Sequence, residues 1–85
     1  MPTLTQAKAP VRPLYEIAKE IKVDWKNVYF GAKPYLSAMQ TLNKISDNYG
    51  EDGAKSIVNY FLANAQTWRG EVAKRIKAEL NKMVK

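Results

Sequence analysis

The stretch AKSIVNYFLANA, residues 54–65, carries the clearest structural pattern of the chain. Its apolar residues recur at spacings of three and four, which is typical of an amphipathic helix with one buried face. These residues are Ala54, Ile57, Val58, Phe61, Leu62 and Ala65. The period holds over the whole stretch, so we expect a helix over residues 53–66 that packs against other elements.

Apolar residues recur at the same spacings, as stripes along one helix face, on both sides of this stretch. Pro13 suits the first position of a helix, and Gly31 and Pro34 read as the stop and start marks of a tight corner. No stretch shows sustained strand alternation. We therefore predict an all-α fold, a compact bundle of four helices over residues 13–30, 34–46, 53–66 and 68–84. Residues 12–85 form a single helical domain and residues 1–11 a flexible arm. The pattern leaves open whether the last two helices are continuous.

The segment SDNYGEDG, residues 46–53, interrupts the helical pattern. Its two glycines and its turn-favouring residues are typical of a connection between helices. It lacks the alternating oxygen ligands and the closing glutamate of a calcium loop. We expect a helix–helix connection here and no metal site.

The composition excludes several kinds of chemistry. The 85 residues include no cysteine and no histidine, which removes thiolate nucleophiles, imidazole bases and Cys/His zinc sites. There is no glycine-rich phosphate loop and no nucleophile–base pair. We expect no catalytic residue and no cofactor, and therefore no enzyme. No apolar run is long enough for a membrane span or a signal peptide, so we expect a cytoplasmic protein that does not bind membranes.

The net charge of +6 is concentrated near the end of the sequence. Such asymmetry indicates an anionic partner or a solvated helix face. The candidates for contact with nucleic-acid phosphates are Lys74, Arg75, Lys77, Lys82 and Lys85. Under the second interpretation, Glu71 pairs with Arg75 and Glu79 with Lys82 along one helix.

Four aromatic residues are candidate anchors for a protein partner: Tyr29, Phe30, Tyr60 and Trp68. Exposed aromatic side chains are favoured at the centres of protein interfaces. The alternative is that the later helices pack on both sides of the first helix and bury these rings. The pattern does not decide between the two interpretations.

Two blocks of the sequence, DWKNVYFGA.PYL.AM and YFLANA.TWRGE.A.RIK.EL, are specific enough to compare with known families. They resemble a family of short proteins encoded by phages and prophages of Gram-positive bacteria, and the likeness covers about residues 14–84. The resemblance implies expression inside a bacterial host cell and a host or phage protein as partner. It implies no particular chemistry.

Together these observations predict a non-enzymatic phage or prophage accessory protein. It is expected to act by protein–protein binding, inhibiting or redirecting a host or defence factor. One alternative is a basic module that binds nucleic acid through its last helix. Another is a homo-oligomeric structural component.

Overall fold

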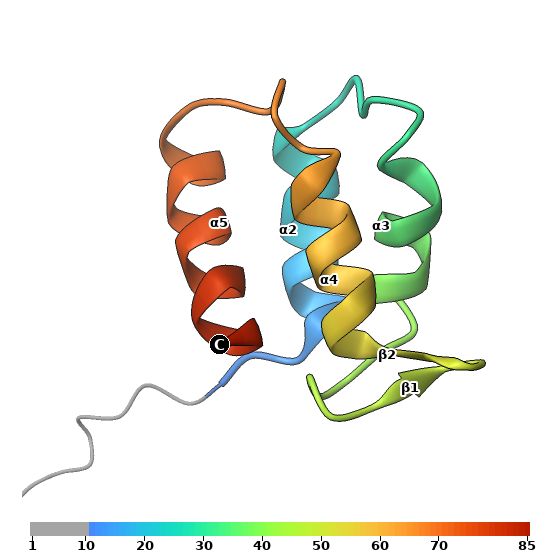
Figure 1. Cartoon of the computed structure of the whole chain (residues 1–85). Helices are drawn as coiled ribbons and strands as arrows, with labels where there is room; N and C mark the ends of the chain where they lie inside the picture. Colours follow the sequence, from blue (N-terminus) through green and yellow to red (C-terminus); the bar gives the residue numbers. More distant parts are fainter. Residues whose placement is uncertain (1–10) are drawn as a thin grey trace, which may run out of the picture.

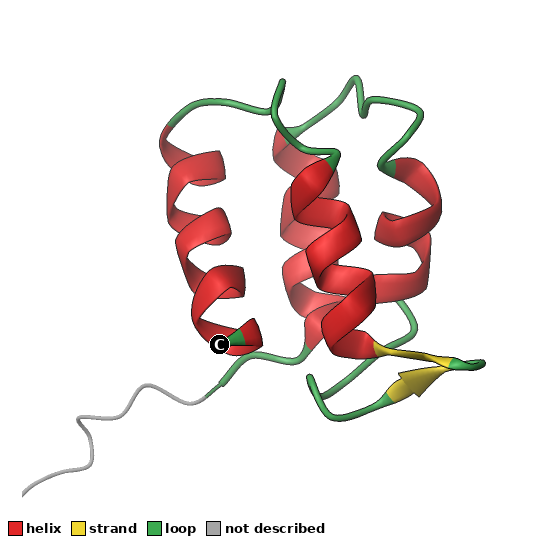
Figure 2. Cartoon of the chain, viewed as in Figure 1, coloured by secondary structure: helices red, strands yellow, loops and turns green. Residues whose placement is uncertain are grey.

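The computed structural model describes residues 11–85, which form four helices and one short β-hairpin (Figures 1 and 2). The helices are α2 (Leu14–Asp24), α3 (Lys33–Met39), α4 (Ala54–Ala63) and α5 (Glu71–Val84). The hairpin pairs β1 (Asn48–Tyr49) antiparallel with β2 (Asp52–Gly53). The prediction of a mostly helical chain with four helices is confirmed, and the small two-stranded sheet was not predicted. The arm predicted for residues 1–11 lies, except for Val11, outside the described residues.

Helix α2 ends at Asp24, well before the predicted end at residue 30. Its buried face consists of Leu14, Ile17, Ala18 and Ile21, as the spacing of these residues predicts. Trp25 follows with a ψ of 84°, outside the helical region, so the backbone turns away at this point. The turn brings the Trp25 ring against a second tryptophan, and this tertiary contact takes the place of a longer helix.

Helix α3 ends at Met39, also earlier than predicted. The backbone N–H of Leu42 donates to the carbonyl three residues back at 3.1 Å, a 3₁₀ turn that tightens the chain. The carbonyls of Leu42 and Asn43 then accept hydrogen bonds of 2.9 Å each from the N–H groups of Tyr15 and Leu14. The first N–H groups of a helix have no partner within that helix. Here the segment after α3 supplies the missing acceptors and so caps the start of α2.

The connection over residues 46–53 contains the β-hairpin in place of the predicted simple turn. Strands of two residues are too short to show an alternating pattern, so they cannot be predicted from the spacing of apolar residues. Asp47 anchors the start of the connection. Its side chain accepts hydrogen bonds of 3.1 and 2.9 Å from two backbone N–H groups, and its carbonyl accepts one of 2.7 Å from Ala54 N–H. These bonds fix where α4 begins.

Helices α4 and α5 are separate, which answers the question that the sequence left open. Helix α4 ends at Ala63, before the predicted end at residue 66, and α5 begins at Glu71 instead of residue 68. Gly70 has a φ of 115°, a backbone conformation that a right-handed helix does not contain and that glycine adopts most readily. Helix α5 therefore starts only after this residue.

The four helices surround a single apolar core. Helices α3 and α5 lie on opposite sides of the molecule, and each contacts both α2 and α4 (Figure 1). The largest fully buried side chains are Phe61, Leu14, Ile17, Ile21, Met39, Ile76, Leu80 and Val58. Burial of these side chains is the main term that stabilises the arrangement. Among the described residues, no helix is long and apolar enough to cross a membrane.

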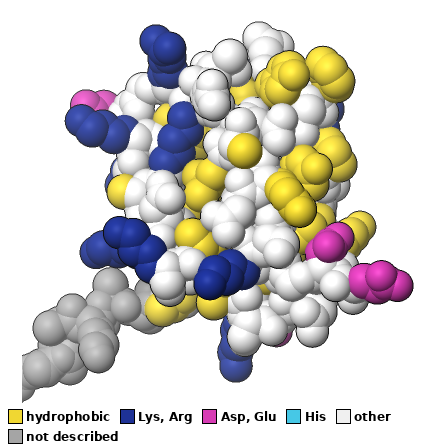
Figure 3. All heavy atoms as spheres, in the orientation of Figure 1, with side chains coloured by type: hydrophobic (Ala, Val, Ile, Leu, Met, Phe, Trp, Pro, Cys, Tyr) yellow, Lys and Arg dark blue, Asp and Glu magenta, His cyan; other side chains and the backbone are white. Residues whose placement is uncertain are grey.

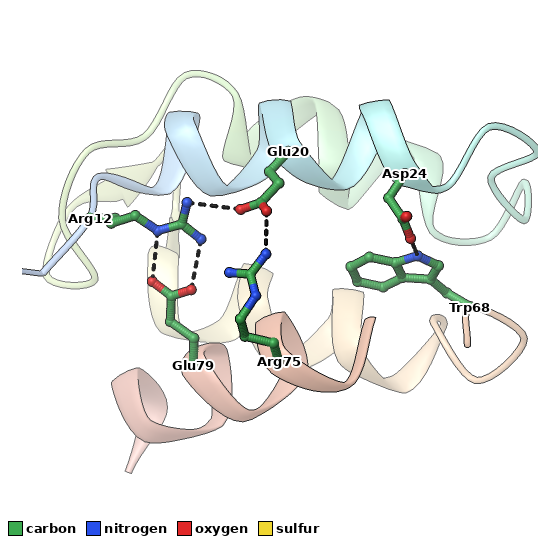
Figure 4. A network of polar contacts seen from close by, with 6 residues as sticks. All are labelled: Arg12, Glu20, Asp24, Trp68, Arg75 and Glu79. Atoms are coloured by element: carbon green, nitrogen blue, oxygen red, sulfur yellow. Dashed lines mark hydrogen bonds and ion pairs between the residues drawn. The ribbon is translucent and has the colours of Figure 1, made fainter. Parts of the chain in front are cut away.

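A network of ion pairs joins α5 to α2 and to the residue that leads into it (Figure 4). Arg12 donates two hydrogen bonds to Glu79, from Nε at 3.0 Å and from Nη2 at 2.7 Å. Its third, from Nη1 to Glu20, measures 2.9 Å. Arg75 donates to the other carboxylate oxygen of Glu20. Arg12, Glu20 and Glu79 are about two-thirds buried, so solvent screens these pairs less than it screens pairs on an open helix face.

The network replaces the pairs predicted within residues 69–85. Arg75 was expected to pair with Glu71, and Glu79 with Lys82, but both residues pair across helices instead. An exposed pair one helical turn apart contributes only about 0.3–0.5 kcal/mol. The bidentate contact between Arg12 and Glu79 is partly buried and therefore stronger. Glu79 accordingly pairs with Arg12 and not with Lys82.

We predict that Glu20 makes the stability of the protein sensitive to acid. The hydrogen bond from Arg75, with a smaller contribution from Arg12, holds the pKa of the Glu20 carboxyl below its ordinary value of 4.5 in spite of partial burial. The folded state therefore binds this proton more weakly than the unfolded chain. The stabilisation is complete above pH 4.5 and is lost as the pH falls through the lower, folded-state pKa.

Urea unfolding between neutral pH and about pH 3 measures this loss. Glu20→Gln should reduce the stability at neutral pH and flatten its decline in acid. Glu16→Gln, which changes an exposed carboxylate one turn earlier on α2, is the matched control and should leave the decline unchanged. An equal effect of both variants would show that net charge, and not the network, is responsible.

Candidate protein-binding surface

The structure places three of the four candidate anchors at the surface. The exposed fractions are 43% for Tyr29, 75% for Phe30 and 50% for Tyr60. Trp68 is only 2% exposed and belongs to the core, so the interpretation of this residue as a surface anchor is corrected. The sequence suggested exposure because Trp68 precedes the α5 stripe, which is the pattern of a loop residue.

Trp68 closes the core at the end of α2. Its ring stacks on Trp25 with 5.6 Å between centroids and 10° between planes, and it meets Phe61 edge-on at 6.4 Å. The indole Nε1 donates a hydrogen bond of 2.8 Å to Asp24 (Figure 4). Lys77 Nζ donates to the Trp68 carbonyl at 2.6 Å and lies over the ring. Trp68 therefore joins the α4–α5 connection to α2.

We predict that Trp68→Ala lowers the free energy of unfolding by about 3–5 kcal/mol, because it empties a large core site. Trp68→Phe keeps most of the ring contacts and removes the hydrogen bond to Asp24, so it should cost less than the alanine variant. Urea unfolding followed by circular dichroism measures both changes. A near-neutral Trp68→Ala would contradict the structural role.

The three exposed anchors take part in two pairs of aromatic rings. Tyr29 and Phe30 lie in the loop between α2 and α3, with their centroids 4.9 Å apart. Tyr35 of α3 and Tyr60 of α4 lie with their centroids 5.3 Å apart. We call these four residues the aromatic patch. Tyr35 was not among the predicted anchors; it is half-buried and packs against the core, with part of its ring at the surface.

Asn64, the residue that ends α4, connects the two pairs. Its Nδ2 donates a hydrogen bond of 2.9 Å to the carbonyl of Tyr60, one helical turn earlier. Its Oδ1 faces Gly31, where an added Cβ would lie 2.8 Å from this oxygen and 2.6 Å from Cε2 of Tyr29. Gly31 is thus needed for close packing. The prediction that Gly31 marks the end of the first helix is wrong, since α2 ends at Asp24 and the φ of Gly31 is not positive.

Tyr29, the neighbour of the exposed Phe30, lines a shallow groove of about 270 Å³. Its lining also includes Ala63, Asn64, Gln66 and Thr67, none of which carries a charge. In the space-filling view, hydrophobic side chains gather over α3 and α4, whereas most Lys and Arg side chains lie over α5 (Figure 3). The aromatic patch therefore borders a neutral surface, which favours a partner with apolar and uncharged groups.

The structure divides the candidate nucleic-acid contacts into two groups. Arg75 pairs with Glu20, and Lys77 is folded over Trp68, where burial and then the nearby Arg69 lower its pKa. The other three, Lys74, Lys82 and Lys85, are exposed and form no ion pair within residues 11–85. Two of the five side chains are thus engaged in holding the fold together.

No protein-family model, curated protein or solved structure matches the chain. The resemblance to phage and prophage proteins stays a prediction. In the part of the chain that the structure describes, no group of three or more acidic residues is placed to hold a metal ion. The aromatic patch is therefore the surface on which a functional proposal is best based.

We predict that Gly31→Ala displaces Tyr29 and destabilises the protein by about 1–3 kcal/mol through overpacking. The added methyl group must push aside the Tyr29 ring, the Asn64 side chain or both. Gly53→Ala is the matched control, since its Cβ would meet its nearest neighbour at 3.7 Å, an ordinary contact distance. Urea unfolding measures the stability, and the NMR signals of the Tyr29 ring report its displacement. Unchanged Tyr29 signals in Gly31→Ala would contradict the packing described here.

Proposed function

We propose that the protein is a non-enzymatic binding protein whose aromatic patch docks on another protein. The observation that carries this proposal is the pair formed by Phe30 and Tyr29. Phe30 is 75% exposed, far more than a core or flanking position requires, and it lies against Tyr29 in a loop that is closely packed at Gly31. A large apolar side chain held at the surface loses favourable burial energy of about 1.5–3 kcal/mol, which a partner restores.

The wider biological setting is part of the same proposal. In it, the protein is a phage or prophage accessory protein in the cytoplasm of a bacterial cell, built as a bundle of four helices. It inhibits or redirects a host or defence factor. The sequence resemblance supports this setting, and the neutral groove next to Tyr29 supports a protein surface as the partner.

Nucleic-acid binding by α5 is the second candidate. It rests on Lys74, Lys82 and Lys85, which project from α5 without a partner among the described residues. Each phosphate contact displaces condensed counterions, so such binding weakens steeply with salt. Binding through the aromatic patch depends mainly on apolar contacts and should respond little to salt.

We predict that Phe30→Ala and Tyr60→Ala each weaken partner binding by about 2 kcal/mol, or roughly thirtyfold, as expected for interface anchors. Because both rings are exposed, the free energy of unfolding should change far less than for Trp68→Ala. Affinity capture from phage-infected bacterial cells, with nuclease treatment, compares the variants with the wild type.

Tyr49→Ala is the matched control, since it removes a similarly exposed ring from the hairpin, at the opposite end of α4 from the Tyr29 loop (Figure 1). It should leave capture unchanged. Capture that survives Phe30→Ala and Tyr60→Ala, while both variants unfold easily, would refute the proposed interface. Capture that nuclease abolishes would favour the nucleic-acid candidate.

A further inference from the structure

A second surface, lined by lysines, lies between the end of α2 and α3. It is a groove of about 460 Å³, which we call the basic groove. The polar side chains that line it are Lys22, Lys26, Asn27, Lys33, Ser37 and Gln40. None of them was singled out in the sequence analysis, because the lysines are spread over two helices and a loop.

The backbone places positive charge on both walls of the basic groove. Lys22 lies in the last turn of α2, and Lys26 follows four residues later in the adjoining loop. Lys33 is the first residue of α3 on the facing wall. Ser37 and Gln40 follow it at spacings of four and three, so they share the face of α3 that borders the groove. A ligand between the walls meets ammonium groups from two directions.

Within residues 11–85, no carboxylate forms an ion pair with these three lysines. None of the side chains that line the basic groove is acidic. Of the acidic residues near the end of α2, Glu20 pairs with two arginines. Asp24 accepts a hydrogen bond from the neutral Trp68 indole and keeps its charge, but it forms no ion pair with the lysines. Uncompensated charges of one sign in a concave site attract counter-ions of the opposite sign.

The lining also indicates the kind of anion. Three lysines provide more positive charge than a single carboxylate requires, and their ammonium groups are flexible donors suited to phosphate oxygens. The volume lies within the range of sites for small molecules. No aromatic side chain lines the groove, and stacking on aromatic rings is how proteins usually hold the bases of a single strand. Asn27, Ser37 and Gln40 add neutral hydrogen-bonding groups.

We propose that the basic groove binds a small molecule carrying two or more linked phosphate groups. Lys22, Lys26 and Lys33 contact the phosphates, and the amides of Asn27 and Gln40 contact the remainder of the ligand. The apolar side chains of Val28 and Leu36 complete the lining. This site is separate from the aromatic patch, so it does not depend on the function proposed above.

Calorimetric titration of the full chain with inorganic tripolyphosphate at an ionic strength of about 0.1 M, where the Debye length is about 10 Å, tests the proposal. Lys22→Gln, Lys26→Gln and Lys33→Gln should each weaken binding about three- to fivefold, the size of one exposed charge contact. Lys55→Gln is the matched control, since it removes the same charge from an exposed position of α4 outside the groove. It should change the affinity less than twofold, since screening weakens a distant charge to roughly that level. All four lysines are exposed, and circular dichroism verifies that each variant is folded.

Three results would overturn the proposal. The first is an absence of saturable binding. The second is a loss of affinity in Lys55→Gln equal to that in the groove variants, which would show only attraction to net charge. The third is tighter binding of a short oligothymidylate than of tripolyphosphate, with the same dependence on Lys22. That result would assign the basic groove to a nucleic-acid backbone.

Discussion

The contact between Trp25 and Trp68 is the constraint on which the rest of the structure depends. The two rings lie nearly parallel, and Phe61 of α4 meets both of them edge-on. Through this contact the end of α2, the body of α4 and the approach to α5 meet at one place. The hydrogen bond from Trp68 to Asp24 fixes the relative orientation of the rings and the helix end. Because Trp25 turns inward here, the following residues must leave the helical path.

The loop created by that turn carries both proposed surfaces. Its residues 26–28 border the basic groove, and Tyr29 and Phe30 begin the aromatic patch. One surface is charged and the other is neutral, although both arise from one short connection. The close packing at Gly31 holds the aromatic side of the loop against α4. The architecture thus separates two kinds of chemistry with few residues.

The sequence predicted which residues enter the core far better than where the helices end. The stripes of α2 and α4 are buried as expected, because helical period and burial are both encoded locally. The ends depend on contacts between distant residues. Helix α2 stops at a tryptophan whose partner lies 43 residues further along the sequence (68 − 25), and the segment that follows α3 caps the start of α2. No local pattern encodes such partners.

The candidate sites were also predicted only in part. The sequence offered Tyr29, Phe30 and Tyr60 as candidate anchors but left open whether the later helices bury them, and the structure shows all three exposed. Trp68 was misjudged because its burial depends on Trp25 and Asp24. The basic groove was missed because its lysines come from separate elements. Only the positions of the acidic residues, which are drawn toward Arg12, Arg75 and Trp68, reveal that these lysines lack partners.

The stacked tryptophans also give the protein a built-in optical reporter. The chain has two tryptophans, and they form a single stacked pair beneath the loop that bears both surfaces. Because the two rings are close and nearly parallel, their electronic transitions couple, and the circular dichroism of the pair depends on how the rings are oriented. Any ligand that shifts the loop alters the emission and the near-ultraviolet dichroism of the pair. Events at either surface are thus visible in the unlabelled protein.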